Sequence, residues 1–210
     1  MEKEVYEKIW ERKKLKEVDY NKKGTRAYEV SCLIKDCDKI LDVGCGDGAL
    51  YTLIKSKCKN YYGLDISKTA LSQIKDKKVN VRIVNLNEQK IPFQDTFFDY
   101  AVCLDVIEHV FDPVKLIEEL FRVTKKEGFV ILSTPNIRYY KHILNLIFGR
   151  FPKTSGDPEH YDGGHLHYFT YKDITGLCSQ KSSKNKKEGI NTKFMIEFFS
   201  SGILIKAKKA

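Results

Sequence analysis

The stretch Ile40-Leu41-Asp42-Val43-Gly44-Cys45-Gly46-Asp47-Gly48-Ala49-Leu50 decides the fold of this 210-residue chain. An apolar run ends at an acid, three glycines follow at alternate positions, and residues that can begin a helix come next. Glycine allows a sharp backbone turn and close approach of a ligand to the main chain. Free N–H groups at a helix start hold polar or anionic groups. The stretch therefore predicts a strand, a tight turn and a helix N-terminus that bind a nucleotide-type cofactor.

The spacing of the glycines narrows the choice of cofactor. A dinucleotide fingerprint is G-x-G-x-x-G, whereas Asp42 here precedes Gly44, Gly46 and Gly48. In this feature the chain resembles the class I S-adenosylmethionine (SAM)-dependent methyltransferases. The resemblance implies that Asp42, Gly44, Cys45 and Gly46 bind SAM, with S-adenosylhomocysteine as the product.

A second acid stands where a nucleotide fold needs one. Residues 61–66 read as a strand that ends at Asp65, and a carboxylate there accepts hydrogen bonds from ribose hydroxyls. The resemblance assigns Asp65 to the SAM ribose and Ile66 to packing on adenine. The alternative is that Asp65 only caps the next helix, because Ser67 is also a typical N-cap residue.

The third and fourth predicted strands extend the same site. A strand over 81–84 leads to Asn85 and Leu86, which the resemblance places at adenine. The family usually has an acid at the position of Asn85, but an amide oxygen also accepts a hydrogen bond. A buried strand over 98–104 adds Leu104 to the cofactor-binding residues. The resemblance covers residues 38–135 and continues weakly to Thr170, where it is similar to the subgroup containing ubiquinone-pathway O-methyltransferases.

The sequence indicates the catalytic residues less clearly than the cofactor-binding residues. The candidates are Asp105, Glu108, His109, His165 and His167, of which His109 and His165 are assigned as general bases for an oxygen acceptor. A helix from Asp105 would put Asp105, Glu108 and His109 on one face, where the three could bind a divalent metal with His165 as a fourth ligand. That alternative resembles metal-dependent small-RNA 2′-O-methyltransferases, and no metal ligand is assigned.

The alternation of elements predicts an α/β fold. Strands and helices alternate up to Thr134, which indicates a Rossmann-like three-layer sandwich. Two apolar segments, 194–199 and 203–207, predict a hairpin. We therefore expect a mostly parallel seven-stranded sheet with an antiparallel C-terminal hairpin, in a single domain over 1–210. Residues 1–30 form a helical cap, with a helix over 4–18, and residues 136–170 form a substrate-side insertion.

Composition excludes several classes of protein. The apolar runs are far shorter than the roughly 20 residues of a membrane span, and no secretory signal is present. None of the six cysteines forms a C-x-x-C pair, which favours reduced thiols and a cytoplasmic location. The net charge is +9, and the lysines at 181–193 read as a solvated segment, so a nucleic-acid partner is not favoured.

The sequence thus predicts a methyltransferase that moves a methyl group from SAM to a small-molecule acceptor, at oxygen. Two alternatives stay open: a metal-dependent RNA 2′-O-methyltransferase, and a SAM-binding scaffold without turnover. The acceptor and the oligomeric state are not encoded in any pattern of the chain.

Overall fold

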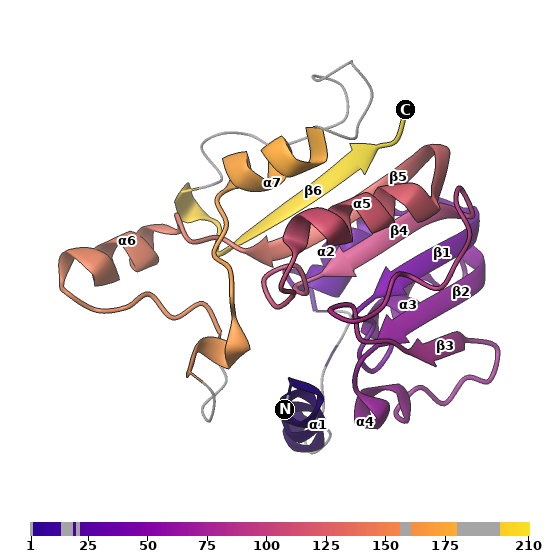
Figure 1. Ribbon diagram of the computed structural model, residues 1–210, viewed down its shortest axis with the longest axis horizontal. Coiled ribbons are helices and arrows are strands. Elements are labelled where there is room, and N and C mark those ends of the chain that lie inside the picture. The colour runs from indigo at the N-terminus through magenta and orange to yellow at the C-terminus, as the bar shows by residue number, and fades with distance from the viewer. Residues whose placement is uncertain (1, 14–18, 20–21, 156–160, 180–197) are drawn as a thin grey trace.

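A single mixed sheet organises the molecule (Figure 1). The computed structural model describes residues 2–13, 19, 22–155, 161–179 and 198–210. Their six strands lie in the order β3-β2-β1-β4-β5-β6. Strands β1 to β5 are parallel, and β6 is antiparallel to β5. The strands are β1 (Cys37–Val43), β2 (Cys58–Asp65), β3 (Asn80–Ile83), β4 (Phe98–Leu104), β5 (Thr124–Pro135) and β6 (Gly202–Lys208).

Helices cover both faces of the sheet and complete three layers. Helices α5 and α7 pack on one face through Leu116, Leu120 and Ile174, together with Leu41 and Leu132 of the sheet. Helices α2 and α3 pack on the other face. The helices are α1 (Glu2–Lys13), α2 (Arg26–Leu33), α3 (Ala49–Ile54), α4 (Lys68–Leu71), α5 (Pro113–Val123), α6 (Tyr140–Ile147) and α7 (Tyr171–Ser179), with a 3₁₀ turn at Tyr161–Gly164.

The order of the strands in the sheet reverses beside β1, and this reversal determines where a ligand can bind. Chain order runs outward from β1 to β3 on one side and from β4 on the other. Loops after β1 and β4 therefore leave the sheet in opposite directions and open a crevice at the carboxyl ends of the strands. Strands β1 and β4 are buried over most of their length, which explains why both read as apolar runs.

Two segments extend beyond the three layers. The first is α1, which packs against α4 at the carboxyl edge of the sheet. The second is the stretch between β5 and α7, from which α6 projects (Figure 1). None of the described helices is long and apolar enough to cross a membrane.

Most predicted elements are confirmed. Helix α5 begins at Pro113 because the side chain of Asp112 caps it and proline suits the first turn of a helix. The predicted fold, a mostly parallel sheet that ends in an antiparallel strand, is confirmed, but the described residues form six strands rather than seven, and β6 pairs directly with β5. Phe198 and Phe199 are helical. The remaining residues of that expected strand, 194–197, lie outside the described residues, as do 14–18 and the lysine-rich 181–193.

Candidate functional site

A cavity of about 760 Å³ lies at the carboxyl ends of the strands, at the reversal of strand order. Its size suits a cofactor and a small second substrate. Every residue that the sequence assigned to the cofactor lines this cavity. These residues are Asp42, Gly44, Cys45, Gly46, Asp65, Ile66, Asn85, Leu86 and Leu104.

The turn after β1 requires glycine for two separate reasons. The φ angles of Gly44, Gly46 and Gly48 are 74°, 54° and 80°, in the left-handed region that disfavours side chains. A Cβ at Gly44 would also lie 2.2 Å from Cγ2 of Val106. The amides of Gly44 and Cys45 both donate to the carbonyl of Leu64, at 2.7 and 3.0 Å. The turn is therefore fixed against the end of β2.

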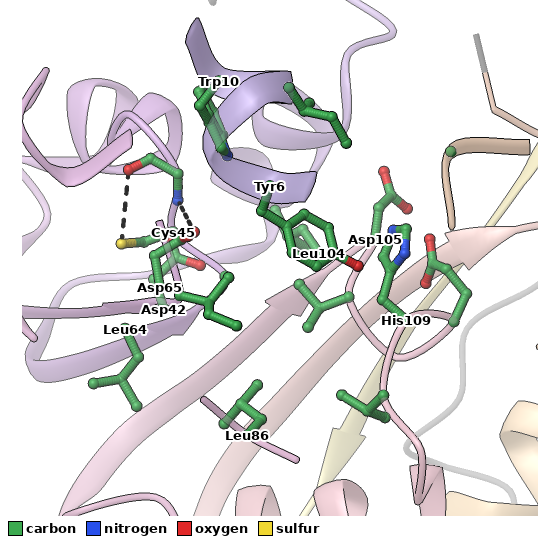
Figure 2. Close-up of a pocket in the computed structure, with 18 of the residues that line it drawn as sticks. Tyr6, Trp10, Asp42, Cys45, Leu64, Asp65, Leu86, Leu104, Asp105 and His109 are labelled. Atoms are coloured by element: carbon green, nitrogen blue, oxygen red, sulfur yellow. Dashed lines mark hydrogen bonds between the residues drawn. The ribbon is translucent and has the colours of Figure 1, made fainter. Parts of the chain in front are cut away.

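Asp65 ties this turn to the second strand (Figure 2). Its Oδ2 accepts a hydrogen bond from the amide of Gly46, and its Oδ1 accepts one from the amide of Ser67, both at 2.8 Å. Burial raises the pKa of Asp65. Ser67 is the N-cap of α4, as the alternative interpretation expected. Asp65 thus holds the walls of the cavity together, and its role at ribose stays a prediction.

Asp42 lies deeper beneath the turn. It is 3% exposed, and the hydroxyl of Tyr61 donates a hydrogen bond to its Oδ2. Burial raises the pKa of Asp42 to about 7, although the hydrogen bond from Tyr61 acts in the opposite direction. A cationic ligand in the cavity would favour the ionised form of this carboxyl.

Helix α1 forms the roof of the cavity. Tyr6 and Trp10 point from it toward the glycine turn and His109 (Figure 2). The Tyr6 and His109 rings meet edge to face at 5.6 Å, and a Cβ at Gly46 would lie 2.5 Å from the Trp10 ring. The sequence predicted a helical cap here, but no role at the cavity for these two side chains.

Glu7 anchors this roof to α4. Its carboxylate accepts hydrogen bonds from the Ser67 hydroxyl and from the amides of Lys68 and Thr69, at 2.9, 2.7 and 3.0 Å. Burial opposes ionisation, but these hydrogen bonds outweigh it and lower the pKa of Glu7 to about 2. The charge suits the amino end of α4.

The opposite wall of the cavity carries Glu108. It is 1% exposed, and its Oε2 accepts a hydrogen bond from the Thr134 hydroxyl at 3.0 Å. Its Oε1 has no hydrogen-bond partner among the described residues. Burial, reinforced by the charge of Asp105, raises the pKa of Glu108 to about 8. Glu108 is therefore protonated at neutral pH when the cavity holds no cation.

Two histidines meet Glu108 at this wall. The imidazoles of His109 and His165 lie 4.7 Å apart, and Nε2 of His165 is 4.0 Å from Oε1 of Glu108. Burial lowers the pKa of both imidazoles, that of His109 to about 4 with help from His165. One ligand atom from each of the three residues lies within 4.8 Å of the other two. The group could hold a divalent cation.

The orientation of His165 is set by two residues that sequence analysis missed, Thr154 and Asp162. The Thr154 hydroxyl lies 3.0 Å from Oδ2 of Asp162 and 2.6 Å from Nδ1 of His165. Burial raises the pKa of Asp162, but hydrogen bonds from Ser155, Tyr168 and Thr154 outweigh it and hold that pKa below its ordinary value.

An ionised carboxylate only accepts hydrogen bonds. Thr154 therefore donates to Asp162 and accepts from Nδ1–H of His165. The Nε2 lone pair of His165 is left directed toward Glu108. No signal in the sequence could link Thr154 to Asp162, because the contact depends on how the loop folds back.

The other two catalytic candidates, Asp105 and His167, do not belong to this group of three. The helix expected from Asp105 is wrong: residues 105–110 form turns, and Asp105 has a φ of 52°. Its carboxylate accepts hydrogen bonds from Arg26 and Ser133, at 3.3 and 2.9 Å. His167 does not line the cavity.

Comparison with known proteins places the chain in a family. The family model described as "Methionine biosynthesis protein MetW" matches residues 26–196. The chain belongs to the MetW family. This match covers the strands and helices from α2 to α7, which include the cavity walls.

Individual relatives agree with the resemblance seen in the glycine turn. A "Probable S-adenosylmethionine-dependent methyltransferase" of Mycobacterium tuberculosis is 30% identical over 50% of this chain and 37% of its own length. A "Ubiquinone biosynthesis O-methyltransferase" of Hydrogenovibrio crunogenus is 31% identical over 52% of this chain and 47% of its own length. The chain thus spans less than half the length of these two relatives.

Solved structures show the same fold. A "SAM dependent methyltransferase" from Archaeoglobus fulgidus superposes with a TM-score of 0.63 at 18% identity, over 88% of this chain and 91% of that one. The similarity to class I methyltransferases that the sequence predicted is therefore confirmed for the fold.

Proposed function

We propose that this MetW-family chain binds SAM in the cavity and transfers its methyl group to the oxygen of a small-molecule acceptor. One observation carries the proposal. All nine residues predicted for the cofactor line one cavity, at the point where a doubly wound sheet binds nucleotides. Relatives with methyltransferase names and methyltransferase folds support it.

The cofactor side supplies a partner for each part of SAM. The glycine turn brings backbone amides close to the methionine moiety, and Asp42 provides a carboxylate for its ammonium group. Asp65 accepts from the ribose hydroxyls, and Asn85 and Leu86 lie where the adenine would be held. Trp10 and Tyr6 cover the turn and exclude water from above.

The opposite wall of the cavity supplies two general bases, the imidazoles of His109 and His165. SAM carries its methyl group on a sulfonium, so sulfur leaves as a neutral thioether. The acceptor oxygen bonds to the methyl carbon, the carbon–sulfur electron pair stays on sulfur, and the acceptor proton passes to the imidazole of His109 or His165. Both imidazoles are neutral near pH 7 because burial lowers the pKa of each.

The proposed class of acceptor rests on the names of relatives. Ubiquinone biosynthesis and methionine biosynthesis, named for a relative and for the family, both concern small molecules. The cavity volume of about 760 Å³ leaves room for such a molecule beside the cofactor. We propose that residues 136–170 form the acceptor wall of one domain, because Thr154 and His165 belong to this insertion.

The test is ligand-dependent stability. We expect S-adenosylhomocysteine at about a hundred times its Kd to add roughly 2.7 kcal/mol of stability, which raises the Tm by several degrees. NAD should leave the Tm unchanged. The variant Asp65→Ala should weaken S-adenosylhomocysteine at least about tenfold, a loss of about 1.4 kcal/mol.

The matched control is Asp36→Ala, an exposed acid just before β1, at the opposite end of that strand from the glycine turn. It should bind like the parent protein. Equal Tm shifts in the two variants would remove the ribose assignment. Absence of any shift in the parent protein would leave a scaffold without cofactor.

A second candidate is metal-assisted transfer, including the RNA 2′-O-methyltransferase alternative. The observation that favours it is the group of Glu108, His109 and His165, in which Oε1 of Glu108 has no hydrogen-bond partner among the described residues. Carboxylate and imidazole donors suit Mn²⁺ better than Mg²⁺. We expect Mn²⁺ to raise the Tm of the parent protein and to have no effect on Glu108→Gln. Equal shifts in both proteins would exclude this site.

A further inference from the structure

Helix α6 has the pattern of a core helix in an exposed position. Tyr140, Ile143, Leu144 and Ile147 follow the spacing i, i+3, i+4, i+7 and form one apolar stripe. Such a stripe normally faces the protein interior. Here Leu144 is 46% and Ile147 69% exposed, and Phe148, at the end of the helix, is 74% exposed.

The rest of the described chain leaves the second half of this stripe, Leu144 and Ile147, uncovered. Helix α6 projects from the three layers (Figure 1) and packs along no other described helix or strand. Its first turn alone is flanked, because the Tyr140 ring lies 6.1 and 5.8 Å from the rings of Phe198 and Phe199. These two phenylalanines are themselves 42% and 65% exposed. We call the surface of Leu144, Ile147, Phe148, Phe198 and Phe199 the α6 surface.

The charged side chains in the segment that carries α6 have one sign. Residues 136–155 contain no aspartate or glutamate. Four basic residues occur in this stretch and all are exposed: Arg138, Lys141, Arg150 and Lys153. The combination of apolar and cationic side chains without anionic ones is that of helices that lie in a lipid–water interface.

We propose that the α6 surface docks on an anionic lipid bilayer, with the apolar stripe among the acyl chains and the basic residues at the headgroups. Charge decides between this occupant and a second copy of the chain. Each protomer would bring the same four cations to a two-fold interface, where they repel, whereas anionic lipids attract each of them. The helix is short, so attachment is shallow and reversible.

Vesicle binding of the full chain tests the proposal. The protein should sediment with vesicles of phosphatidylcholine and phosphatidylglycerol and stay in solution with phosphatidylcholine alone. Binding should fall as salt rises from about 0.1 M to about 1 M, where the Debye length shrinks from about 10 Å to about 3 Å. Equal binding to both kinds of vesicle would overturn the proposal.

Two matched pairs of variants locate the contact. Phe148→Ser should lower the partition coefficient about tenfold or more, whereas Phe111→Ser, at a residue 67% exposed before α5, should not change it. Lys141→Glu should lower the coefficient about tenfold or more, whereas Lys172→Glu, an exposed charge reversal on α7, should have a much smaller effect. All four positions are exposed, so folding should survive. Equal losses within either pair would contradict the assignment to α6.

A second copy as the occupant would give a different result. Sedimentation equilibrium without lipid would then show a dimer that Phe148→Ser dissociates, with no vesicle binding by the parent protein, and the proposal would be wrong. Vesicle binding requires neither SAM nor an acceptor. The outcome is therefore independent of the proposed methyl transfer.

Discussion

The two walls of the cavity are built in different ways. The cofactor wall follows β1, β2 and β3, where backbone turns and strand ends place each group within a few residues of a strand. The proposed acceptor wall joins the turn at 105–110 to the insertion at 136–170. There, contacts between residues far apart in the chain position side chains, as in the hydrogen bond from the Thr134 hydroxyl to Glu108.

This difference explains which amino-acid substitutions each wall tolerates. On the cofactor wall the constraint is conformational, because Gly44, Gly46 and Gly48 all have positive φ angles. On the acceptor wall the constraint is a network of hydrogen bonds, such as the one from Thr154 to Asp162. Substitution of these glycines therefore strains the backbone, whereas a substitution on the proposed acceptor wall removes single hydrogen bonds.

The largest effect should come from Gly44→Ala, compared with Gly149→Ala at the end of α6. Both glycines have positive φ angles, 74° and 67°, but only Gly44 lacks room for a Cβ. The left-handed conformation costs about 1–2 kcal/mol in each variant. The overlap with Val106 adds about 1–3 kcal/mol in Gly44→Ala. Urea unfolding should show this difference, and S-adenosylhomocysteine binding should be lost only in Gly44→Ala.

Equal destabilisation by the two substitutions would contradict the contrast between the walls. It would mean that the turn after β1 can move away from Val106. Retention of ligand binding in Gly44→Ala would remove the backbone turn from the cofactor site.

Substitution of the buried carboxyl Asp42 should have an effect of intermediate size on the pH dependence of stability. Its native pKa of about 7 is above the ordinary value of 3.8, so the folded state holds a proton that the unfolded state releases. This contribution is full below about pH 4 and is lost as pH rises toward 7. His109, with a pKa lowered to about 4, has the opposite sign. The difference between Asp42→Asn and the parent protein therefore isolates the contribution of Asp42.

We expect that difference to move by about 2 kcal/mol in favour of Asp42→Asn between pH 5 and pH 7. Glu108→Gln should behave similarly in stability, because the pKa of Glu108 is also raised by burial. The two variants should differ in binding. Affinity for S-adenosylhomocysteine should rise with pH in Glu108→Gln and in the parent protein, but not in Asp42→Asn. A pH-independent affinity in the parent protein would contradict the assignment of Asp42 to the ligand ammonium.

The same contrast decides what could be predicted from the sequence. The strand ends at Asp42 and Asp65 were predicted because apolar runs and glycine spacing are local patterns. Glu7 and Trp10 were missed because their partners, Ser67 and Gly46, are distant in the chain. The strand expected over 194–199 does not include Phe198 and Phe199, which are helical, because apolar content alone does not distinguish a strand from a short helix.

The acceptor wall was predicted only as a set of residue types. Glu108, His109 and His165 were named as candidates, but the helix that was to align the first two does not form. A turn and the folded-back insertion bring them together instead. Spacing rules apply to regular elements, so they could not give this arrangement.

The smallest effect should come from Thr154→Val, which removes the hydroxyl between Asp162 and His165 at nearly constant shape. Loss of its hydrogen bonds should cost about 1 kcal/mol of stability. Affinity for S-adenosylhomocysteine should stay within about twofold, because the cofactor wall is untouched. The diagnostic readout is the ¹⁵N shift of the His165 imidazole, which should change from the Nδ1–H tautomer to a mixture.

Thr175→Val is the matched control, because the Thr175 hydroxyl donates only to its own helix, at Lys172. It should leave the His165 tautomer unchanged, and His142, hydrogen-bonded to the Asn136 carbonyl, provides an internal reference in both variants. An unchanged His165 tautomer in Thr154→Val would mean that Glu108, not the insertion, orients this imidazole. The acceptor wall would then depend on the turn after β4, and the two walls would be more alike than the hydrogen bonds indicate.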